Sequence, residues 1–343
     1  MSETASYRWA FLAAAAVAVG VGAAGLLDLR NMPYAGYSAA RQFDVVRVYP
    51  GSPAEAAGLQ VGDRVKAVGG IRSTDTKALW RRPRAEIGET RTYCVERAGE
   101  LEEIDVTFGA VPRRYYLRAG LSTVVGLCFL GFTLWAYQRV PSRATAFLAL
   151  FGVCFGLAFF PAPYSRDFIV RAFSEAVATI IVVAGFAFLI HYLMLFPKRR
   201  ALLDKSWALW MIYLPAALVG LVLLGLILVQ PDFTATVRAT VSWVILVFTV
   251  GYFGGALLSV VDSYRRATPE ERSSGGVRMM LVATAIGLLP MIAGAVLRTL
   301  APAVLLPGED FYPLALGLVP IAFALAALRR RPGPGPLAAA APG

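Results

Sequence analysis

Histidine is almost absent from this 343-residue sequence, which has a single one, His191. A zinc site of the intramembrane protease type needs two histidines at helical spacing with a glutamate beside the first. A serine triad also needs a histidine next to its nucleophile, whereas His191 lies in an apolar segment and is followed by Tyr-Leu-Met-Leu. An aspartyl intramembrane protease would need two membrane-embedded aspartates, and Asp262 has no such partner. We therefore expect no enzyme: no catalytic residues, no metal site and no cofactor.

Cysteine and charge are also scarce. Cys94, Cys128 and Cys154 are an odd set, two of them inside apolar segments, so no disulfide framework or metal site is predicted. Charged residues make up 16% of the chain, compared with about 25% in a soluble globular protein.

Long apolar runs take the place of the missing charge, since 57% of the residues are hydrophobic. Runs of about 20 apolar residues cross a bilayer as helices. The sequence predicts a polytopic α-helical membrane protein with about eight transmembrane helices, at 9–27, 116–137, 144–162, 171–196, 207–229, 239–261, 278–300 and 311–328.

The net charge of +11 follows the connections between these runs. Lys and Arg concentrate in 138–143, 197–206, 262–278 and the tail from 329, while the alternate loops carry few. This is the positive-inside pattern. It predicts an inner (cytoplasmic) membrane protein with both termini cytoplasmic and residues 28–115 outside, and it disfavours nucleic acid as a partner. A retained first helix is favoured over a cleaved signal peptide, whose apolar region would be shorter.

The segment outside the membrane contains "YPGSPAEAAGLQVGDRVKAVGG" at 49–70. Ser52 is placed to cap a short helix, with Pro53 at its first position and Glu55 three residues after the cap. Gly58 is placed to end that helix in a left-handed conformation. Strands are predicted at 43–48 and 64–68 on either side.

This segment resembles the bacterial type of PDZ domain, whose pattern is PGSPAxxAGLxxGDxIxxVxG. The resemblance implies a second helix at 74–82, a hairpin at 91–108 and a peptide-binding groove. In PDZ domains a peptide or protein C-terminus adds a strand to the sheet edge, and its carboxylate is held by backbone N–H groups. Transferred to this chain, the groove residues would be Ala35, Gly36, Tyr37, Ser38, Arg41 and Leu79. The alternative is a structural or dimerising cap without a ligand.

The helical segments carry a second resemblance, in "FLIHYLMLFPKRR" (188–200), "DSYRRATPEERSSGGVRMMLVATAIGLLPMI" (262–292) and "PLALGLVPIAFALAALRRR" (313–331). After one span and an outer PDZ domain, they are similar to the sensor half of bacterial seven-helix signalling proteins. These are the competence-type sensor histidine kinases and related membrane serine phosphatases. The resemblance implies a membrane sensor that relays a signal to a cytoplasmic kinase- or phosphatase-type partner.

The expected domains are an N-terminal helix at 1–28, the PDZ domain at 29–112, a seven-helix block at 113–331 and a disordered Pro/Gly/Ala tail at 332–343. The chain would be a stand-alone sensor or a fragment of a longer one. Membrane transport and a structural adaptor role are the alternatives to sensing. Gly-xxx-Gly spacing at 251–255 permits close helix packing, within the chain or in a homodimer. The basic loops are expected to contact membrane lipids.

Three ionisable residues fall at membrane depth, where charge is costly and usually faces a bundle interior. They are Glu175, His191 and Arg298. Glu175 and Arg298 are predicted at similar depth and would pair, unless both side chains extend to the interface.

Overall fold

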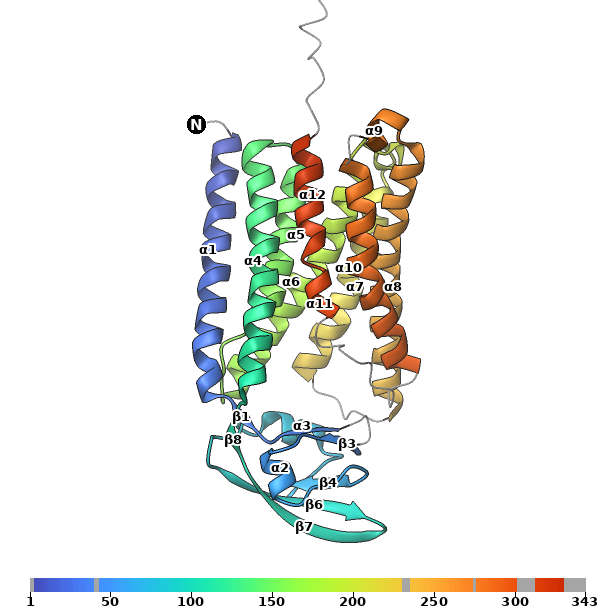
Figure 1. The fold of residues 1–343 in the computed structure, drawn as a ribbon. Helices are drawn as coiled ribbons and strands as arrows, with labels where there is room; N and C mark the ends of the chain where they lie inside the picture. The colour runs from blue at the N-terminus through green and yellow to red at the C-terminus, as the bar shows by residue number, and fades with distance from the viewer. Residues whose placement is uncertain (1–2, 40–42, 230–234, 274–275, 301–311, 330–343) are drawn as a thin grey trace, which may run out of the picture.

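The computed structural model describes residues 3–39, 43–229, 235–273, 276–300 and 312–329. It consists of a bundle of long helices and a small α+β domain, residues 33–110, at one end of the bundle (Figure 1). The N-terminal helix begins at the end of the bundle away from this domain and ends beside it (Figure 1).

The α+β domain contains eight short strands and two short helices. In chain order they are β1 (Pro33–Tyr34), β2 (Tyr37–Ala39), β3 (Val45–Val48), α2 (Pro53–Ala56), β4 (Arg64–Val68), β5 (Ile71–Arg72), α3 (Thr76–Arg81), β6 (Thr90–Arg97), β7 (Glu100–Thr107) and β8 (Gly109–Ala110). The largest sheet has the order β5-β4-β6-β7, while β2 pairs with β3 and β1 with β8. All of these pairings are antiparallel.

Local sequence accounts for the first half of this domain. The Ser52 hydroxyl accepts a hydrogen bond from the Glu55 backbone N–H at 3.2 Å, which caps α2. The Glu55 carboxylate accepts from the N–H of Gly51 at 2.7 Å. Gly58 has a φ of 88°, as a left-handed helix end requires. Leu59 follows and is buried with Val65 and Val95 in the core of the domain.

One ion pair anchors the end of α2 to the hairpin. Asp63 is 1% exposed and accepts two hydrogen bonds from the Arg97 guanidinium, at 2.7 and 2.8 Å. Arg97 also donates to the carbonyl oxygen of Gly58 at 2.8 Å. The Arg97 hydrogen bonds lower the pKa of Asp63 below its usual value.

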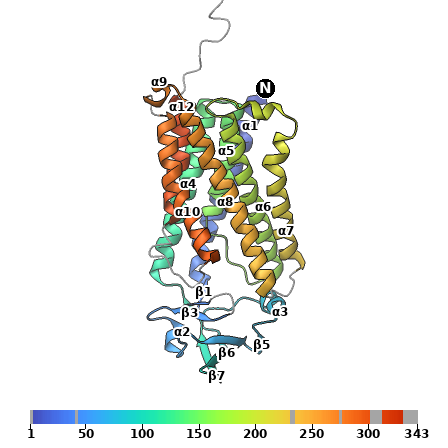
Figure 2. The same cartoon turned by 90° about the vertical axis from the view of Figure 1, so that its right-hand side faces the viewer.

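Helices make up the rest of the chain. They are α1 (Glu3–Asp28), η1 (Leu29–Asn31), α4 (Arg113–Arg139), α5 (Arg143–Phe159), α6 (Phe168–Leu195), η2 (Ala201–Asp204), α7 (Ala208–Val229), α8 (Ala235–Arg266), α9 (Pro269–Ser273), α10 (Gly276–Leu300), α11 (Tyr312–Ala315) and α12 (Leu318–Arg329). The long helices run roughly along one direction, with the α+β domain below them (Figure 2).

Six helices of the described residues are long and apolar enough to cross a membrane: α1, α4, α6, α7, α8 and α10. The other two of the eight expected segments form the shorter apolar helices α5 and α12, so the exact count of spans stays a prediction. Helix α5 has 17 residues, a length of about 26 Å at 1.5 Å per residue, because it begins after the Ser142 cap and ends before Pro161. Helix α12 has only 12 residues, since the helix is interrupted between α11 and α12. Both are apolar, and α5 is at the lower limit of about 17 residues for a helix that spans a bilayer.

The helices pack around one aromatic core. Phe129, Phe151 and Phe155, from α4 and α5, lie in contact with ring centroids 4.8–5.6 Å apart. Phe186 of α6 extends this cluster toward Phe253 of α8, with centroids 4.7 Å apart. Such ring pairs give the bundle a defined packing, which lipid alone would not impose.

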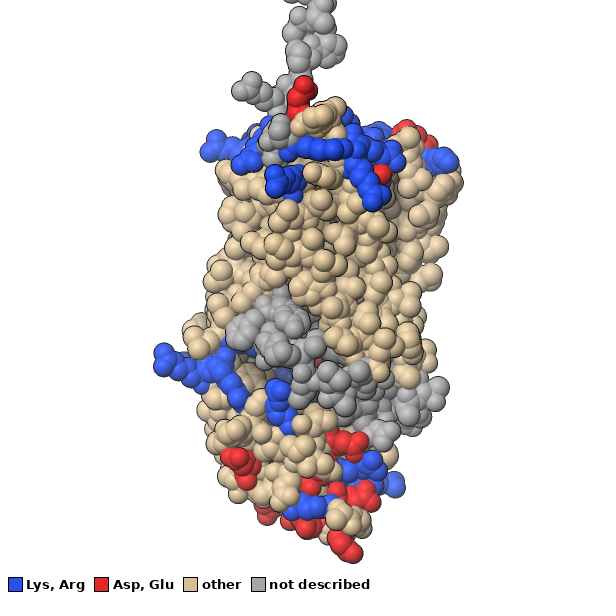
Figure 3. Space-filling model, turned by 45° about the vertical axis from the view of Figure 1, so that its right-hand side comes forward, with Lys and Arg blue, Asp and Glu red and all other residues tan. Residues whose placement is uncertain are grey.

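On the face shown in Figure 3, the charged side chains of the described residues lie toward the two ends of the molecule. A belt of uncharged surface separates Lys and Arg at the end away from the α+β domain from the mixed charges on that domain (Figure 3). This distribution is that of a protein embedded in a bilayer.

Candidate functional site

The candidate peptide-binding groove consists of the free edge of β2 and helix α3, the two elements that the PDZ resemblance assigns to it. Among the described strands, β2 pairs only with β3, so its other edge has no strand partner there. An unpaired edge presents backbone N–H and C=O groups that a peptide in extended conformation can bind.

The loop before β2 is held close to the start of α2. The carbonyl oxygens of Ala35 and Gly36 accept hydrogen bonds from the N–H groups of Ala54 and Tyr49, at 2.8 and 2.9 Å. Gly36 has a φ of 90°, and a Cβ at this position would lie 2.1 Å from the Cβ of Ser52. A glycine is required here by both backbone conformation and space, so this short loop is rigidly held without a glycine-rich sequence.

The side chains predicted for the groove have different roles. Tyr37 packs edge-to-face on Tyr93 with centroids 5.9 Å apart, and burial raises the pKa of Tyr37. The Tyr37 ring is therefore part of the core packing of the domain. Its backbone, on β2, is the part of this residue that a peptide could bind. The Ser38 hydroxyl lies 3.4 Å from the Tyr49 hydroxyl. Leu79 on α3 is half-buried, which leaves apolar surface for a ligand side chain.

The two arginines at the end of α3 make contacts away from the free edge of β2. Arg82 donates a hydrogen bond to the carbonyl oxygen of Val68 at 2.8 Å, which links the end of α3 to the end of β4. The Arg81 guanidinium lies 5.8 Å from the ring centroid of Phe168, at the start of α6. Arg41 lies outside the described residues.

A cation that the sequence did not single out lies beside the loop. Arg114, in the first turn of α4, has its guanidinium 4.0 Å from the ring centroid of Tyr49. It also donates a hydrogen bond to the hydroxyl of Tyr34, which directly precedes Ala35. The sequence shows only that Arg114 lies four residues after the end of the last strand, β8, which does not indicate this contact.

Helix α3 is attached to the membrane helices by Arg171 of α6. This side chain is 7% exposed and donates hydrogen bonds to the carbonyl oxygens of Trp80 and, at 3.3 Å, Arg82. Its guanidinium also lies 5.1 Å from the centroid of the Trp80 ring. These carbonyls belong to the end of α3, so one buried guanidinium caps α3 from the neighbouring part of the molecule.

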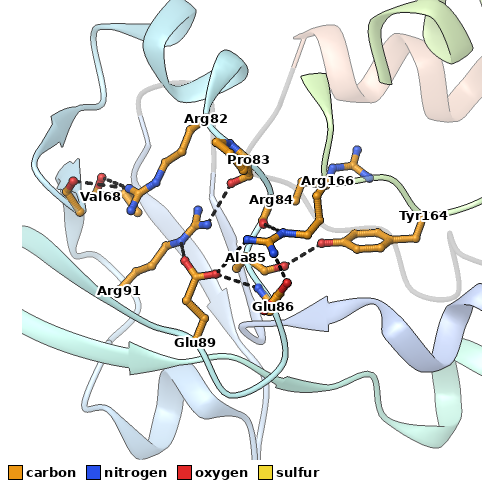
Figure 4. Close-up of polar contacts among 11 residues, drawn as sticks. Val68, Arg82, Pro83, Arg84, Ala85, Glu86, Glu89, Arg91, Tyr164 and Arg166 are labelled. Atoms are coloured by element: carbon orange, nitrogen blue, oxygen red, sulfur yellow. Dashed lines mark hydrogen bonds and ion pairs between the residues drawn. The ribbon is translucent and has the colours of Figure 1, made fainter. Parts of the chain in front are cut away.

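The segment after α3 continues this attachment (Figure 4). The Tyr164 hydroxyl donates to the carbonyl oxygen of Ala85 at 2.7 Å. Arg166 donates to the carbonyl oxygen of Arg84 at 3.1 Å and pairs with the carboxylate of Glu86. We call these contacts, together with those of Arg171, the α3–α6 junction.

Two of the three predicted membrane-embedded ionisable residues, Glu175 and His191, have side chains that the structure describes, and they lie in separate surroundings. Glu175 is half-buried and interacts electrostatically with Arg84 and Arg171 at the α3–α6 junction. His191 is buried, stacks on Phe147 with centroids 3.8 Å apart and lies 2.7 Å, at Nδ1, from the Tyr213 hydroxyl. Arg298 belongs to α10, and its side chain lies outside the described residues, so the predicted pair with Glu175 stays a prediction.

Comparison with known proteins supports the domain assignment. Residues 45–81 match the family model of the PDZ domain. The zinc metalloprotease RasP of Shouchella clausii (strain KSM-K16) is 33% identical over 107 residues, which are 30% of this chain and 26% of that protein. The chain therefore matches about a quarter of that relative's length. No solved structure matches the chain. These findings identify a multi-pass membrane protein that contains a PDZ domain.

The same comparison contradicts the expectation that the chain is not an enzyme, because the curated relative is a zinc metalloprotease. The expectation depended on counting ligands for known types of catalytic site, and sequence similarity is independent of that count. No group of three or more His, Cys, Asp or Glu side chains suited to a metal ion occurs within the described ranges. The similarity therefore locates no metal centre in that part of the chain.

Proposed function

We propose that this protein is a membrane-embedded receptor whose PDZ domain binds the C-terminus of a peptide or protein and whose helices relay the binding to a cytoplasmic partner. The observation that carries the proposal is the α3–α6 junction. The helix that lines the groove is attached through buried Arg171 to a helix of 28 residues. A ligand that moves α3 therefore changes the contacts of α6.

The relay needs two states with different affinities for the ligand. In the junction, the Arg171 and Tyr164 hydrogen bonds fix one position of α3 relative to α6. A bound peptide between β2 and α3 would displace α3 from this position. If the peptide binds the displaced state more tightly than the attached state, the equilibrium between the two states shifts by that difference in affinity. Helix α6 then carries the change to residues 196–204 at the other end of the bundle.

The charge distribution supports the orientation in this proposal. Lys and Arg gather at the end of the bundle away from the PDZ domain (Figure 3), which by the positive-inside rule is the cytoplasmic end. The PDZ domain then lies outside the inner membrane, and the output partner binds the cytoplasmic end.

Binding is tested on the full chain in lipid nanodiscs with a library of peptides that have free or amidated C-termini. We expect free carboxylates to be selected and Leu79→Gln to abolish the selection. Lys77→Gln, which changes an exposed residue of the same helix, should bind like the wild type. Equal binding of free and amidated peptides, or equal loss in both variants, would show that this groove is not the recognition site.

Relay is tested separately, by hydrogen exchange of residues 196–204 with and without a selected peptide. A peptide-dependent change that is lost in Arg171→Met supports relay through the junction. If a peptide binds but the hydrogen exchange of residues 196–204 does not change, the relay is refuted and only peptide binding by the PDZ domain is supported.

The similarity to RasP favours a second candidate, a role in membrane proteolysis in which the PDZ domain binds the protein substrate. This candidate predicts that a membrane protein ending in a selected peptide is cleaved when mixed with the purified chain in vesicles. It also predicts that a zinc chelator stops the cleavage, and an intact substrate in both samples argues against it.

A further inference from the structure

The end of the bundle away from the PDZ domain contains a cavity of about 490 Å³. It lies between the residues that follow α6, the ends of α8 and α12, and the start of α10. Its charged lining comprises Lys198, Arg199, Arg200, Arg266 and Arg329 against Asp262 and Glu271. Arg199 is paired with Asp204, which lies outside this lining, at 2.7 Å. The other four cations face two anions, which leaves an excess of two positive charges.

The ion pairs within the cavity do not remove this excess. Arg200 and Arg266 share the single carboxylate of Asp262, at 3.0 and 2.9 Å. Lys198 pairs with Glu271 at 2.9 Å. Arg329 makes no ion pair with an acidic side chain of the described residues. An anion with several oxygen acceptors would therefore complete the charge balance.

A second hollow, of about 680 Å³, lies between α6, α7 and α8. Its lining is almost wholly apolar, and Met211, Trp243 and Val247 on its rim are 51–67% exposed. In a bilayer such a rim faces the acyl chains.

Arg200 lines the cationic cavity and also contacts a residue that lines the apolar hollow. Its guanidinium donates to the carbonyl oxygen of Ser259 at 2.7 Å, and Ser259 lines the apolar hollow. The same guanidinium lies 3.4 Å from the hydroxyl of Ser263, which lines the cationic cavity. The two serines are one turn apart on α8, a rise of about 6 Å. This rise is comparable to the distance from the phosphate of a phospholipid to the first carbons of its acyl chains.

We propose that this pair of hollows is a binding site for one anionic phospholipid. The phosphate occupies the cationic cavity, and an acyl chain lies in the apolar hollow. The cation excess selects a headgroup with net negative charge over a zwitterionic one, since an ammonium group would meet Arg266 and Arg329. The apolar hollow favours a lipid over a soluble phosphate compound.

The headgroup part is tested by native mass spectrometry of the full chain in detergent, with phosphatidylglycerol or phosphatidylcholine added. We expect one phosphatidylglycerol to be retained in preference to phosphatidylcholine. Arg266→Gln and Arg329→Gln should each weaken the retention by about tenfold, the effect of losing one charge-assisted hydrogen bond. Arg265→Gln is the matched control, because this exposed neighbour carries the same charge and does not line the cavity.

The acyl part is tested with two glycines of α8. Gly251 lines the apolar hollow and Gly254 does not, and an added Cβ meets no atom within 4 Å at either. Gly251→Leu should therefore fill the hollow and lose the phosphatidylglycerol, while Gly254→Leu should retain it.

Three results would overturn the proposal. Equal retention of the two lipids, or equal loss in Arg265→Gln and Arg266→Gln, would show only general surface attraction. Equal retention of phosphatidylglycerol by Gly251→Leu and Gly254→Leu would show that no acyl chain lies in the apolar hollow. Inorganic phosphate that displaces phosphatidylglycerol completely at millimolar concentration would identify a soluble anion as the ligand.

Discussion

Replacing Arg171 with methionine should release the PDZ helix α3 from the membrane helices without unfolding either part. Methionine keeps an unbranched apolar side chain of similar length but removes every hydrogen bond that the guanidinium donates to the carbonyls of Trp80 and Arg82. The change therefore isolates the polar part of the α3–α6 junction.

The free energy lost in Arg171→Met follows from these contacts. A hydrogen bond from a charged donor contributes about 1.5–3 kcal/mol, and the interaction with the Trp80 ring adds about 0.5–2 kcal/mol. One of the two bonds is long, at 3.3 Å, and the buried Nε of Arg171 has no hydrogen-bond partner among the described residues. An unpaired buried donor costs about 1–3 kcal/mol. The net loss on substitution is therefore about 2 kcal/mol, or roughly 30-fold in the opening equilibrium.

Hydrogen exchange of the full chain in nanodiscs measures this opening. The amides of Leu79 and Arg82, which bond to Asp75 and Ala78 within α3, should exchange roughly 30-fold faster in Arg171→Met. Arg30→Met is the control, since Arg30 is an exposed arginine at the same end of the bundle. Unchanged exchange in α3 would refute the role of Arg171. Equal acceleration in the β6–β7 hairpin would mean that the whole domain unfolds, and it would also refute the reasoning.

Two further predictions concern the stability of each part. The PDZ domain should keep its stability at neutral pH and lose about 2 kcal/mol as the pH falls below about 4, because protonation of Asp63, whose pKa Arg97 lowers, removes this pair. Acid unfolding followed by circular dichroism should show this step in the wild type and not in Asp63→Asn, and identical acid profiles would contradict it. In the bundle, Gly152→Ala should lower the melting temperature, because the added Cβ would lie 1.8 Å from the Thr133 Oγ1. Gly131→Ala is the control, and it should be neutral or stabilising because the space around Gly131 is open. If both variants melt like each other in detergent, the α4–α5 contact adapts to the added methyl group and the prediction is wrong.

Much of the architecture could be predicted from the sequence because its causes are local. Runs of apolar residues identified the long helices, since the bilayer selects for length and hydropathy alone. The motif at 49–70 indicated the PDZ domain, and the structure has β4 at the predicted Arg64–Val68 and the Ser52 cap on α2. The bounds of α5 and the break before α12 differ from the predicted segments, because helix ends depend on caps and breaks that hydropathy does not register.

The groove could be predicted only in outline. Tyr37 lies on β2, the strand predicted to pair with a peptide, but its ring packs on Tyr93 in the core of the domain. Motif position does not tell which way a side chain points, because that depends on the neighbours that folding brings to it.

The sequence by itself determined that the chain crosses a membrane and includes a PDZ domain, since hydropathy and turn residues act over a few positions. Only the tertiary structure decided how the two parts meet. Arg171 contacts a carbonyl 91 residues earlier in the chain, and Arg200 contacts one 59 residues later. Such contacts leave no periodic signal, because they depend on the packing of whole helices rather than on the residues beside them.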